Sequence, residues 1–121
     1  MTGSPSAARE IHLVGAATLA EGQTQTFAFE RKKYPVQGFL IRYHGELLAY
    51  LNMCQHWPIP LDMGDEDFFY SDIDRIRCKT HGATYDPGTG LCDTGPCVGG
   101  QLIGYPVRIE GQDIWVTVSD A

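Results

Sequence analysis

The sequence predicts an all-β protein, and three observations lead to this expectation. Apolar side chains alternate with a period of two through most of the chain, as in strands that bury one face. No stretch combines a 3.6-residue apolar period with capping residues, so no amphipathic helix is expected. Fourteen glycines and seven prolines are spread between the alternating segments, where they mark short turns.

The expected strands follow one another as hairpins. Two early strands are expected at residues 11–15 and 25–30. Two later runs of alternating residues are joined by a turn at His44-Gly45-Glu46. The first run places Phe39, Ile41 and Tyr43 on one face and Leu40, Arg42 and His44 on the other. The second run places Leu47, Ala49, Leu51 and Met53 on one face. A last hairpin has its turn at Gly111-Gln112, between the run Tyr105, Val107, Ile109 and the run Ile114, Val116, Val118.

Length and charge limit the function classes. The 121 residues, 43% of them hydrophobic, suffice for one domain over residues 1–121 with its own core. The chain has no run of 18 apolar residues and no apolar export signal at its start, so we expect a cytoplasmic protein with no membrane partner. The net charge of −6 disfavours a nucleic-acid partner, because phosphate binding requires a basic face.

The chemistry-bearing residues gather in two short motifs. Cys54-Gln-His56 and Cys78-Lys-Thr-His81 together contain two of the four cysteines and two of the four histidines. Without an export signal, four cysteines are poorly explained as two disulfides. Two thiolates and two imidazoles from two loops would suit a structural zinc ion or a binuclear iron–sulfur cluster. Zinc sites more often take both thiolates from one turn, so the repeated order of Cys then His favours the cluster, with both cysteines on one iron and both histidines on the other.

At these residues the chain resembles the Rieske family, and more closely its small soluble bacterial ferredoxins. The likeness rests on Cys54-Gln-His56-Trp57-Pro58-Ile59-Pro60-Leu61-Asp62 and on Cys78-Lys-Thr-His81-Gly82-Ala83-Thr84-Tyr85-Asp86, and it extends over about residues 36–118. The resemblance implies antiparallel β sheets as a base, with a smaller cluster-binding lobe inserted at about residues 54–100. It also implies one [2Fe-2S] cluster held by Cys54, His56, Cys78 and His81.

Several neighbouring residues receive expected roles from the resemblance. Pro96 belongs to a third loop, Gly95-Pro96, which helps to cover the cluster. Trp57 follows a ligand directly and either packs at the lobe boundary or contacts a partner. After Gly82, the family's high-potential members carry a serine where this chain has Ala83, whereas the tyrosine that bonds a ligand sulfur is kept as Tyr85. The potential is therefore expected to be lower than in the respiratory proteins.

The chain also departs from the family pattern. The 21 residues between His56 and Cys78 make an unusually long gap, which places an insertion around residues 65–74. Ile59 and Thr80 stand where respiratory members carry a disulfide, so that bridge cannot form, and no membrane anchor is visible. These departures indicate a soluble carrier.

The inserted segment is acidic, and a basic strand follows it. Six acids and no base occur at residues 62–74: Asp62, Asp65, Glu66, Asp67, Asp72 and Asp74. The segment is either a solvated loop tied down by Phe68, Phe69 and Tyr70 or a docking patch for a basic redox partner. In the strand that follows, Arg75, Arg77 and Lys79 are expected outward, where they pair with the insertion, and Ile76 and Cys78 inward.

The remaining cysteines and histidines have ordinary interpretations. Cys92 and Cys97 are expected as reduced, partly buried packing groups, although a disulfide between them is an open alternative. His12 and His44 are expected as surface or strand histidines.

The predicted function is one-electron transfer without catalysis of its own. Electrons would come from a flavin reductase and pass to an acceptor such as a ring-hydroxylating oxygenase. Two alternatives are a Rieske subunit of a larger oxidoreductase such as a nitrite reductase, and a redox-sensing or zinc-stabilised binding module.

Overall fold

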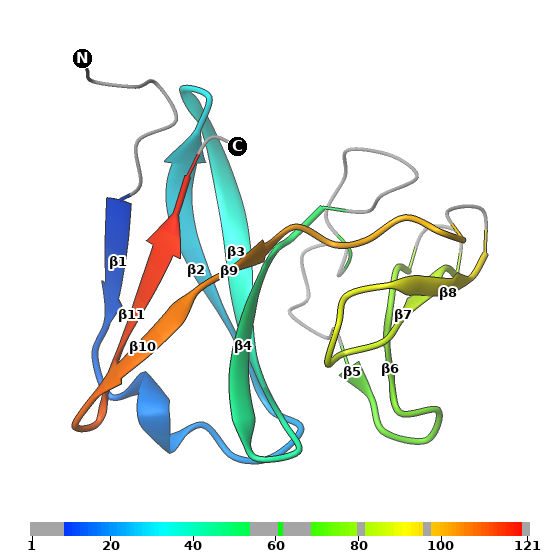
Figure 1. The fold of residues 1–121 in the computed structure, drawn as a ribbon, viewed down its shortest axis with the longest axis horizontal. Helices are drawn as coiled ribbons and strands as arrows, with labels where there is room; N and C mark the ends of the chain where they lie inside the picture. Colours follow the sequence, from blue (N-terminus) through cyan, green and yellow to red (C-terminus); the bar gives the residue numbers. More distant parts are fainter. Residues whose placement is uncertain (1–8, 54–60, 62–68, 80–81, 96–97, 120–121) are drawn as a thin grey trace.

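Antiparallel sheets form nearly the whole of the protein, as a computed structural model of the chain shows (Figure 1). The structure describes residues 9–53, 61, 69–79, 82–95 and 98–119. Within these ranges there are eleven strands and one short 3₁₀ helix, η1, at Ala16–Thr18. The all-β expectation is confirmed, and no helix in the described ranges is long and apolar enough to cross a membrane.

Two sheets pack against each other to form the base, which occupies the left of Figure 1. The first sheet has the order β1-β11-β10, with bounds Arg9–Leu13, Asp113–Val118 and Val107–Glu110. The second has the order β2-β3-β4-β9, with bounds Thr24–Arg31, Tyr34–Tyr43, Glu46–Leu51 and Gly104–Tyr105. Figure 1 places the third sheet beside β4, as a separate lobe. Its order is β5-β6-β7-β8, with bounds Phe69–Tyr70, Arg75–Arg77, Thr84–Tyr85 and Cys92–Thr94.

Strand β3 is buried on both faces because it separates two cores. Phe39, Ile41 and Tyr43 point into a core shared with the lobe, and Leu40 points into the core of the base. The predicted alternation on β3 is therefore confirmed. Burial on both sides of one strand joins the lobe to the base through a continuous apolar layer.

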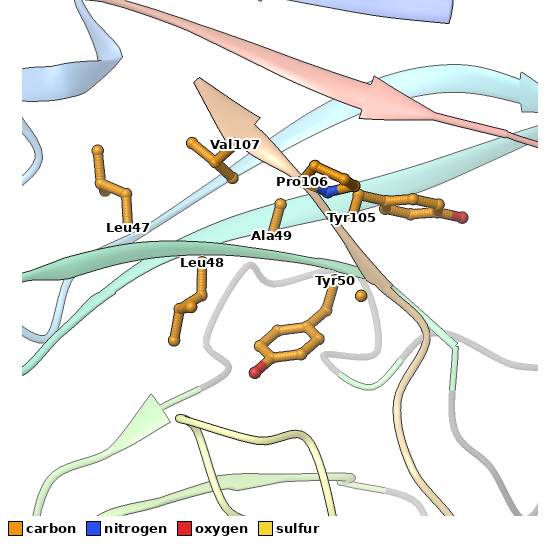
Figure 2. A pocket seen from close by; sticks show the side chains of 8 residues that line it. Leu47, Leu48, Ala49, Tyr50, Tyr105, Pro106 and Val107 are labelled. Carbon is orange, nitrogen blue, oxygen red and sulfur yellow. The ribbon is translucent and has the colours of Figure 1, made fainter. Parts of the chain in front are cut away.

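Strand β4 shows the same alternation beside an open apolar groove (Figure 2). Leu47 and Ala49 lie on the side of Val107 and Pro106, whereas Leu48 and Tyr50 point the other way. The groove opens because β9 pairs with β4 at two positions only, after which the chain continues into β10 of the other sheet.

The two predicted hairpin turns are present. Between β3 and β4 the turn is the pair His44-Gly45, with φ of 51° and 83°, so Glu46 already belongs to β4. Gly111 and Gln112 join β10 to β11. Both pairs are two-residue loops, whose backbone twist matches that of the flanking strands. Ile109, from the last hairpin, lies more than half exposed near the end of β10 and outside the core.

One strand boundary differs from the expected one, which was residues 11–15. The first strand runs from Arg9 to Leu13, because the chain turns into η1 beyond it. Strand β3 begins at Tyr34 although Pro35 follows at once. Pro35 pairs with β2, whereas β4 reaches only as far as Gly38, so the missing N–H falls on an open edge.

Arg42, on the same face of β3 as Leu40, has its side chain bound to backbone carbonyl groups. Its guanidinium donates from Nε to the Leu19 carbonyl at 2.9 Å, from Nη2 to the Ala17 carbonyl at 2.6 Å, and from Nη1 to the Gly45 carbonyl at 2.9 Å. These charge-assisted bonds fasten the segment after η1 to the β3–β4 turn.

The carboxylate of Glu21 completes the same attachment. It accepts hydrogen bonds from the amides of Gly45 at 2.9 Å and of His44 at 2.6 Å. These two amides lower the pKa of Glu21 below its ordinary value, because they stabilise the charged form.

The histidines of the base lie where they were expected. His12, on β1, stacks on Trp115 with ring centroids 4.2 Å apart and contacts Asp113 at 2.8 Å. His44 stacks on Tyr43 at the β3–β4 turn.

Candidate metal centre

The two ends of the segment that contains Cys54 and His56 are held together. Asn52 is the buried polar residue of the described core, and its side-chain oxygen accepts the Leu61 amide at 2.8 Å. The Asn52 amide in turn donates to the Gln37 carbonyl of β3 at 2.9 Å. Asn52 therefore fixes the chain to β3 just before the first motif and binds it again at Leu61, after the motif. Cys54, His56 and Trp57 themselves lie outside the described residues.

The second motif lies in a loop after β6 whose two ends are joined by backbone hydrogen bonds. The Cys78 amide donates to the Ala83 carbonyl at 2.8 Å, and the Gly82 amide donates to the Cys78 carbonyl at 2.9 Å. Gly82 adopts a φ of 75°, which costs little only for glycine. Cys78 is fully buried in the core that the lobe shares with β3. His81 lies outside the described residues.

One hydrogen bond connects the two motifs. The Lys79 amide, directly after Cys78, donates to the Leu61 carbonyl at 3.0 Å. The end of the first motif and the beginning of the second are thus in direct contact, although 16 residues separate Leu61 from Cys78. This contact brings the segment after His56 next to Cys78, as a centre bridging two loops requires.

A third segment crosses the second motif at Ala83. Gly95 has a φ of 97°, and a Cβ atom there would lie 2.7 Å from the Ala83 Cα and 3.2 Å from the Ala83 nitrogen. Gly95 therefore lies against the loop that follows Cys78. Pro96 lies outside the described residues.

The strand register before Cys78 is confirmed. Ile76 and Cys78 are fully buried, whereas Arg77 is exposed. Arg77 extends over the ring of Tyr70, with its guanidinium carbon 5.7 Å from the ring centroid.

The carboxylate partner of Arg75 is not the expected one. The Arg75 guanidinium donates to Asp93 of β8 at 2.7 Å, outside the acidic insertion. The Thr84 hydroxyl also donates to Asp93, at 2.6 Å. These bonds lower the pKa of Asp93, with the Thr84 bond the larger cause, and Asp93 raises the pKa of Arg75. Asp93 is near in space but 18 residues away in sequence, so no local pattern pointed to it.

The described end of the acidic insertion is attached to the lobe core. Phe69 packs against that core, and the Tyr43 hydroxyl donates to the Asp74 carboxylate at 2.6 Å. This carboxylate raises the pKa of Tyr43 to about 12, because it stabilises the protonated phenol. Tyr70 is half-buried. Ser71, Asp72 and Ile73 are exposed, and the insertion residues before Phe69 lie outside the described ranges.

Cys92 is a packing residue. It is buried in the lobe core, is not part of a disulfide, and its thiol donates to the Thr94 carbonyl at 3.3 Å. This agrees with the expectation for Cys92, and Cys97 lies outside the described residues.

Tyr85 remains the candidate donor to a ligand sulfur. It is fully buried in the same core as Cys78 and pairs with Cys92 across β7 and β8. Ala83 is also fully buried and offers only a methyl group at the position of the family's serine.

We expect Tyr85→Phe to lower the reduction potential by tens of millivolts with the cluster retained. A hydrogen bond to a charged group contributes roughly 1.5–3 kcal/mol, and if half of it differs between redox states the shift is roughly 30–65 mV. Protein-film voltammetry measures this shift. Tyr50→Phe is the matched control, because the Tyr50 hydroxyl of the same core donates to the Pro87 carbonyl at 2.7 Å. Equal potentials for the wild type and Tyr85→Phe would show that the hydroxyl does not act on the sulfur.

The donor chemistry of the site fits a binuclear cluster. The described part holds no group of three or more metal-binding side chains, since Cys78 is the only proposed ligand within it. Cys78 nevertheless supplies a buried thiol at the point where both motifs meet. Two thiolates and two imidazoles on such paired loops match the ligation of a Rieske centre.

Comparisons with known proteins agree with this fold and site. The family model described as "Rieske [2Fe-2S] domain" matches residues 10–113. The solved ferredoxin of carbazole 1,9a-dioxygenase from Nocardioides aromaticivorans IC177 is 27% identical with a TM-score of 0.64, and the match covers 88% of this chain and 95% of that one. No curated protein sequence matches the chain significantly.

Two further solved structures share the fold at lower identity. One is a complex of reduced oxygenase and oxidized ferredoxin in carbazole 1,9a-dioxygenase, at 20% identity and a TM-score of 0.66, covering 88% of this chain and 91% of that one. The other is the terminal oxygenase of carbazole 1,9a-dioxygenase from Novosphingobium sp. KA1, at 24% identity and a TM-score of 0.69. That match covers 93% of this chain and 30% of the oxygenase chain.

Fold and site together define a small electron-transfer protein built from β sheets. The chain belongs to the Rieske [2Fe-2S] domain family, and its cofactor is one [2Fe-2S] cluster.

Proposed function

We propose that this chain is a cytoplasmic Rieske ferredoxin that carries single electrons from a flavin reductase to an oxygenase. The observation that carries the proposal is the family match over residues 10–113, which spans both Cys-His motifs. The 27% identical structure is itself a ferredoxin of a dioxygenase, and it is matched over 95% of its length. We further propose one domain over residues 1–121, with residues 54–100 as the cluster-binding lobe.

The proposed ligands are Cys54 and Cys78 on one iron and His56 and His81 on the other. The bound cluster supplies one-electron redox chemistry. The chain's own residues hold the two ligand motifs against each other through Leu61 and Lys79, and they enclose Cys78 in an apolar core that excludes water. Trp57, Gly82, Ala83, Tyr85 and Pro96 are proposed as the residues surrounding the cluster.

Electron paramagnetic resonance of the dithionite-reduced protein tests the cluster. We expect one unpaired electron per chain, nitrogen couplings from two histidines, and two irons and two sulfides on analysis. One zinc ion per chain without sulfide would refute the proposal and would support a zinc-stabilised binding module.

Substitution of Cys78 tests the ligand assignment. Cys78→Ala is expected to prevent cluster assembly, because one iron would lose a thiolate. Cys92→Ala is the matched control, since Cys92 is also a buried thiol of the lobe core, and its variant should keep the full visible spectrum. Iron content and the visible spectrum of the two purified variants measure the difference. A complete cluster in Cys78→Ala would remove Cys78 from the ligand set.

A further inference from the structure

The turn between β2 and β3 has an unfavourable backbone. Lys32 and Lys33 form it, with φ of 53° and 68°, so two consecutive lysines are left-handed. The other two-residue hairpin turns of the described part, His44-Gly45 and Gly111-Gln112, each contain a glycine. A left-handed residue with a Cβ costs roughly 1–2 kcal/mol, so Asn-Gly would suit this turn better. Backbone strain of this kind is found most often where a side chain is needed for function.

Positive charge is concentrated around this turn. The basic tip, as we call it, consists of Arg9, Glu30, Arg31, Lys32, Lys33 and Tyr34. Arg9 belongs to it because its guanidinium donates to the Glu30 carbonyl. The basic tip holds four of the nine basic residues and one acid, so its formal charge is +3, and the rest of the chain carries −9 against the total of −6. Tyr34 is 72% exposed and adds an aromatic ring to this surface.

The basic tip projects at the end of the base where the first ligand motif begins. The Asn52 amide is bonded to the Gln37 carbonyl, and Cys54 follows Asn52 by two residues. Lys33 precedes Gln37 by four residues, which is about 13 Å of extended chain. Figure 1 shows the β2–β3 hairpin extending past the ends of β4 and β9, the other two strands of this sheet, at this end. A typical interface of about 800 Å² per partner, centred near Gln37 and Asn52, would extend about 16 Å from its centre and would include the basic tip.

We propose that the basic tip docks an acidic patch on a redox protein partner while the cluster faces that partner's redox centre. The inference rests on the proposed carrier function. An acidic protein patch fits better than a membrane or a nucleic acid, because the −9 charge on the rest of the chain would be repelled by an extended anionic surface. The charge pairing speeds and orients encounter, and screening by salt weakens it.

The test uses the holoprotein and the variant Lys32→Asn/Lys33→Gly with two haem acceptors. One electron leaves the reduced cluster and reduces one ferric haem, either in cytochrome b5, which has an acidic surface, or in cytochrome c, which has a basic one. At low salt we expect the variant to reduce cytochrome b5 about 3–10-fold more slowly, with no such loss toward cytochrome c. At high salt the difference should disappear. The thermal midpoint of the variant should rise, because Asn-Gly suits the turn.

Each other outcome has a definite meaning. Equal rates with cytochrome b5 for the wild type and the variant, or equal slowing with both acceptors, would overturn the proposal. Binding of the wild type to phosphatidylserine vesicles that the variant loses would overturn it in favour of a membrane contact. Lys33→Gln removes one charge and leaves Lys32 unchanged. This variant should also reduce cytochrome b5 more slowly than the wild type, but by less than the double variant does. Absence of the cluster signal from the wild type would refute the carrier function itself, before any comparison of acceptors.

Discussion

Replacing Gly95 by alanine is expected to abolish retention of the cluster while the base stays folded. The added Cβ would lie 2.7 Å from the Cα and 3.2 Å from the nitrogen of Ala83, and these backbone atoms cannot turn aside as a flexible side chain would. The Ala83 carbonyl accepts the Cys78 amide, so a shift of Ala83 displaces the loop that presents Cys78. With a φ of 97°, Gly95 also adopts a conformation that strains alanine.

We estimate a cost of about 2–4 kcal/mol to the lobe, from overpacking together with backbone strain. The visible absorbance of the cluster during incubation at moderate temperature measures its retention, and far-UV circular dichroism reports the strands. Gly99→Ala is the matched control, because Gly99 has a φ of 94° but nothing within 4 Å of an added Cβ. The control carries the strain without the collision, so equal loss of the cluster in both variants would contradict a collision at Ala83.

The base was predictable from the sequence wherever strands were long enough to show alternation. Phe39 and Leu40 were assigned to opposite faces, and in the structure they lie in two different cores. The lobe strands β5 and β7 have two residues each, which is too short for any periodicity, so they were not predicted individually, whereas alternation did predict the register of β6. Pro35 is tolerated within β3 because β4 pairs with β3 only as far as Gly38, which leaves the edge beside Pro35 open.

Interactions between residues far apart in sequence are the second feature that could not be predicted. Arg75 was expected to point outward and to pair with the acidic insertion, and Arg42 was assigned only to one face of its strand. In the structure, Arg42 binds the carbonyls of Ala17 and Leu19 and Arg75 binds Asp93, and these partners are 18 to 25 residues away in sequence, so no local pattern specified them. The ligand motifs, in contrast, were visible because residue type and spacing alone define that chemistry. What the sequence did not indicate was the contact between Leu61 and Lys79 that fastens one motif to the other.

The second large effect is expected in the base, where Gly38→Ala should destabilise the protein by about 2–4 kcal/mol. Gly38 lies opposite Phe27 in the β2–β3 pair, and an added Cβ would lie 2.4 Å from Cζ of that ring. Phe27 is buried in the core of the base, so its ring cannot move into solvent without loss of packing. Such a glycine lets an aromatic ring from the neighbouring strand cover its backbone.

A change in urea midpoint, followed by far-UV circular dichroism on the cluster-loaded protein, measures this cost. Gly104→Ala on β9 of the same sheet is the control, because its added Cβ would meet its nearest neighbour, Tyr50, at an ordinary 3.6 Å. The control should unfold within about 1 kcal/mol of the wild type, since alanine also reduces the entropy of the unfolded chain.

A double-mutant cycle with Phe27→Leu identifies the cause of the Gly38→Ala effect. Leucine removes the ring atoms that the new methyl group would meet, so Gly38→Ala should cost much less in that background than in the wild type. The two substitutions together should therefore destabilise by less than the sum of their separate effects, with a coupling of about 1–3 kcal/mol. If alanine destabilised only by changing the backbone of β3, its cost would be the same in both backgrounds. Additive costs would thus exclude the ring contact as the reason for glycine at this position.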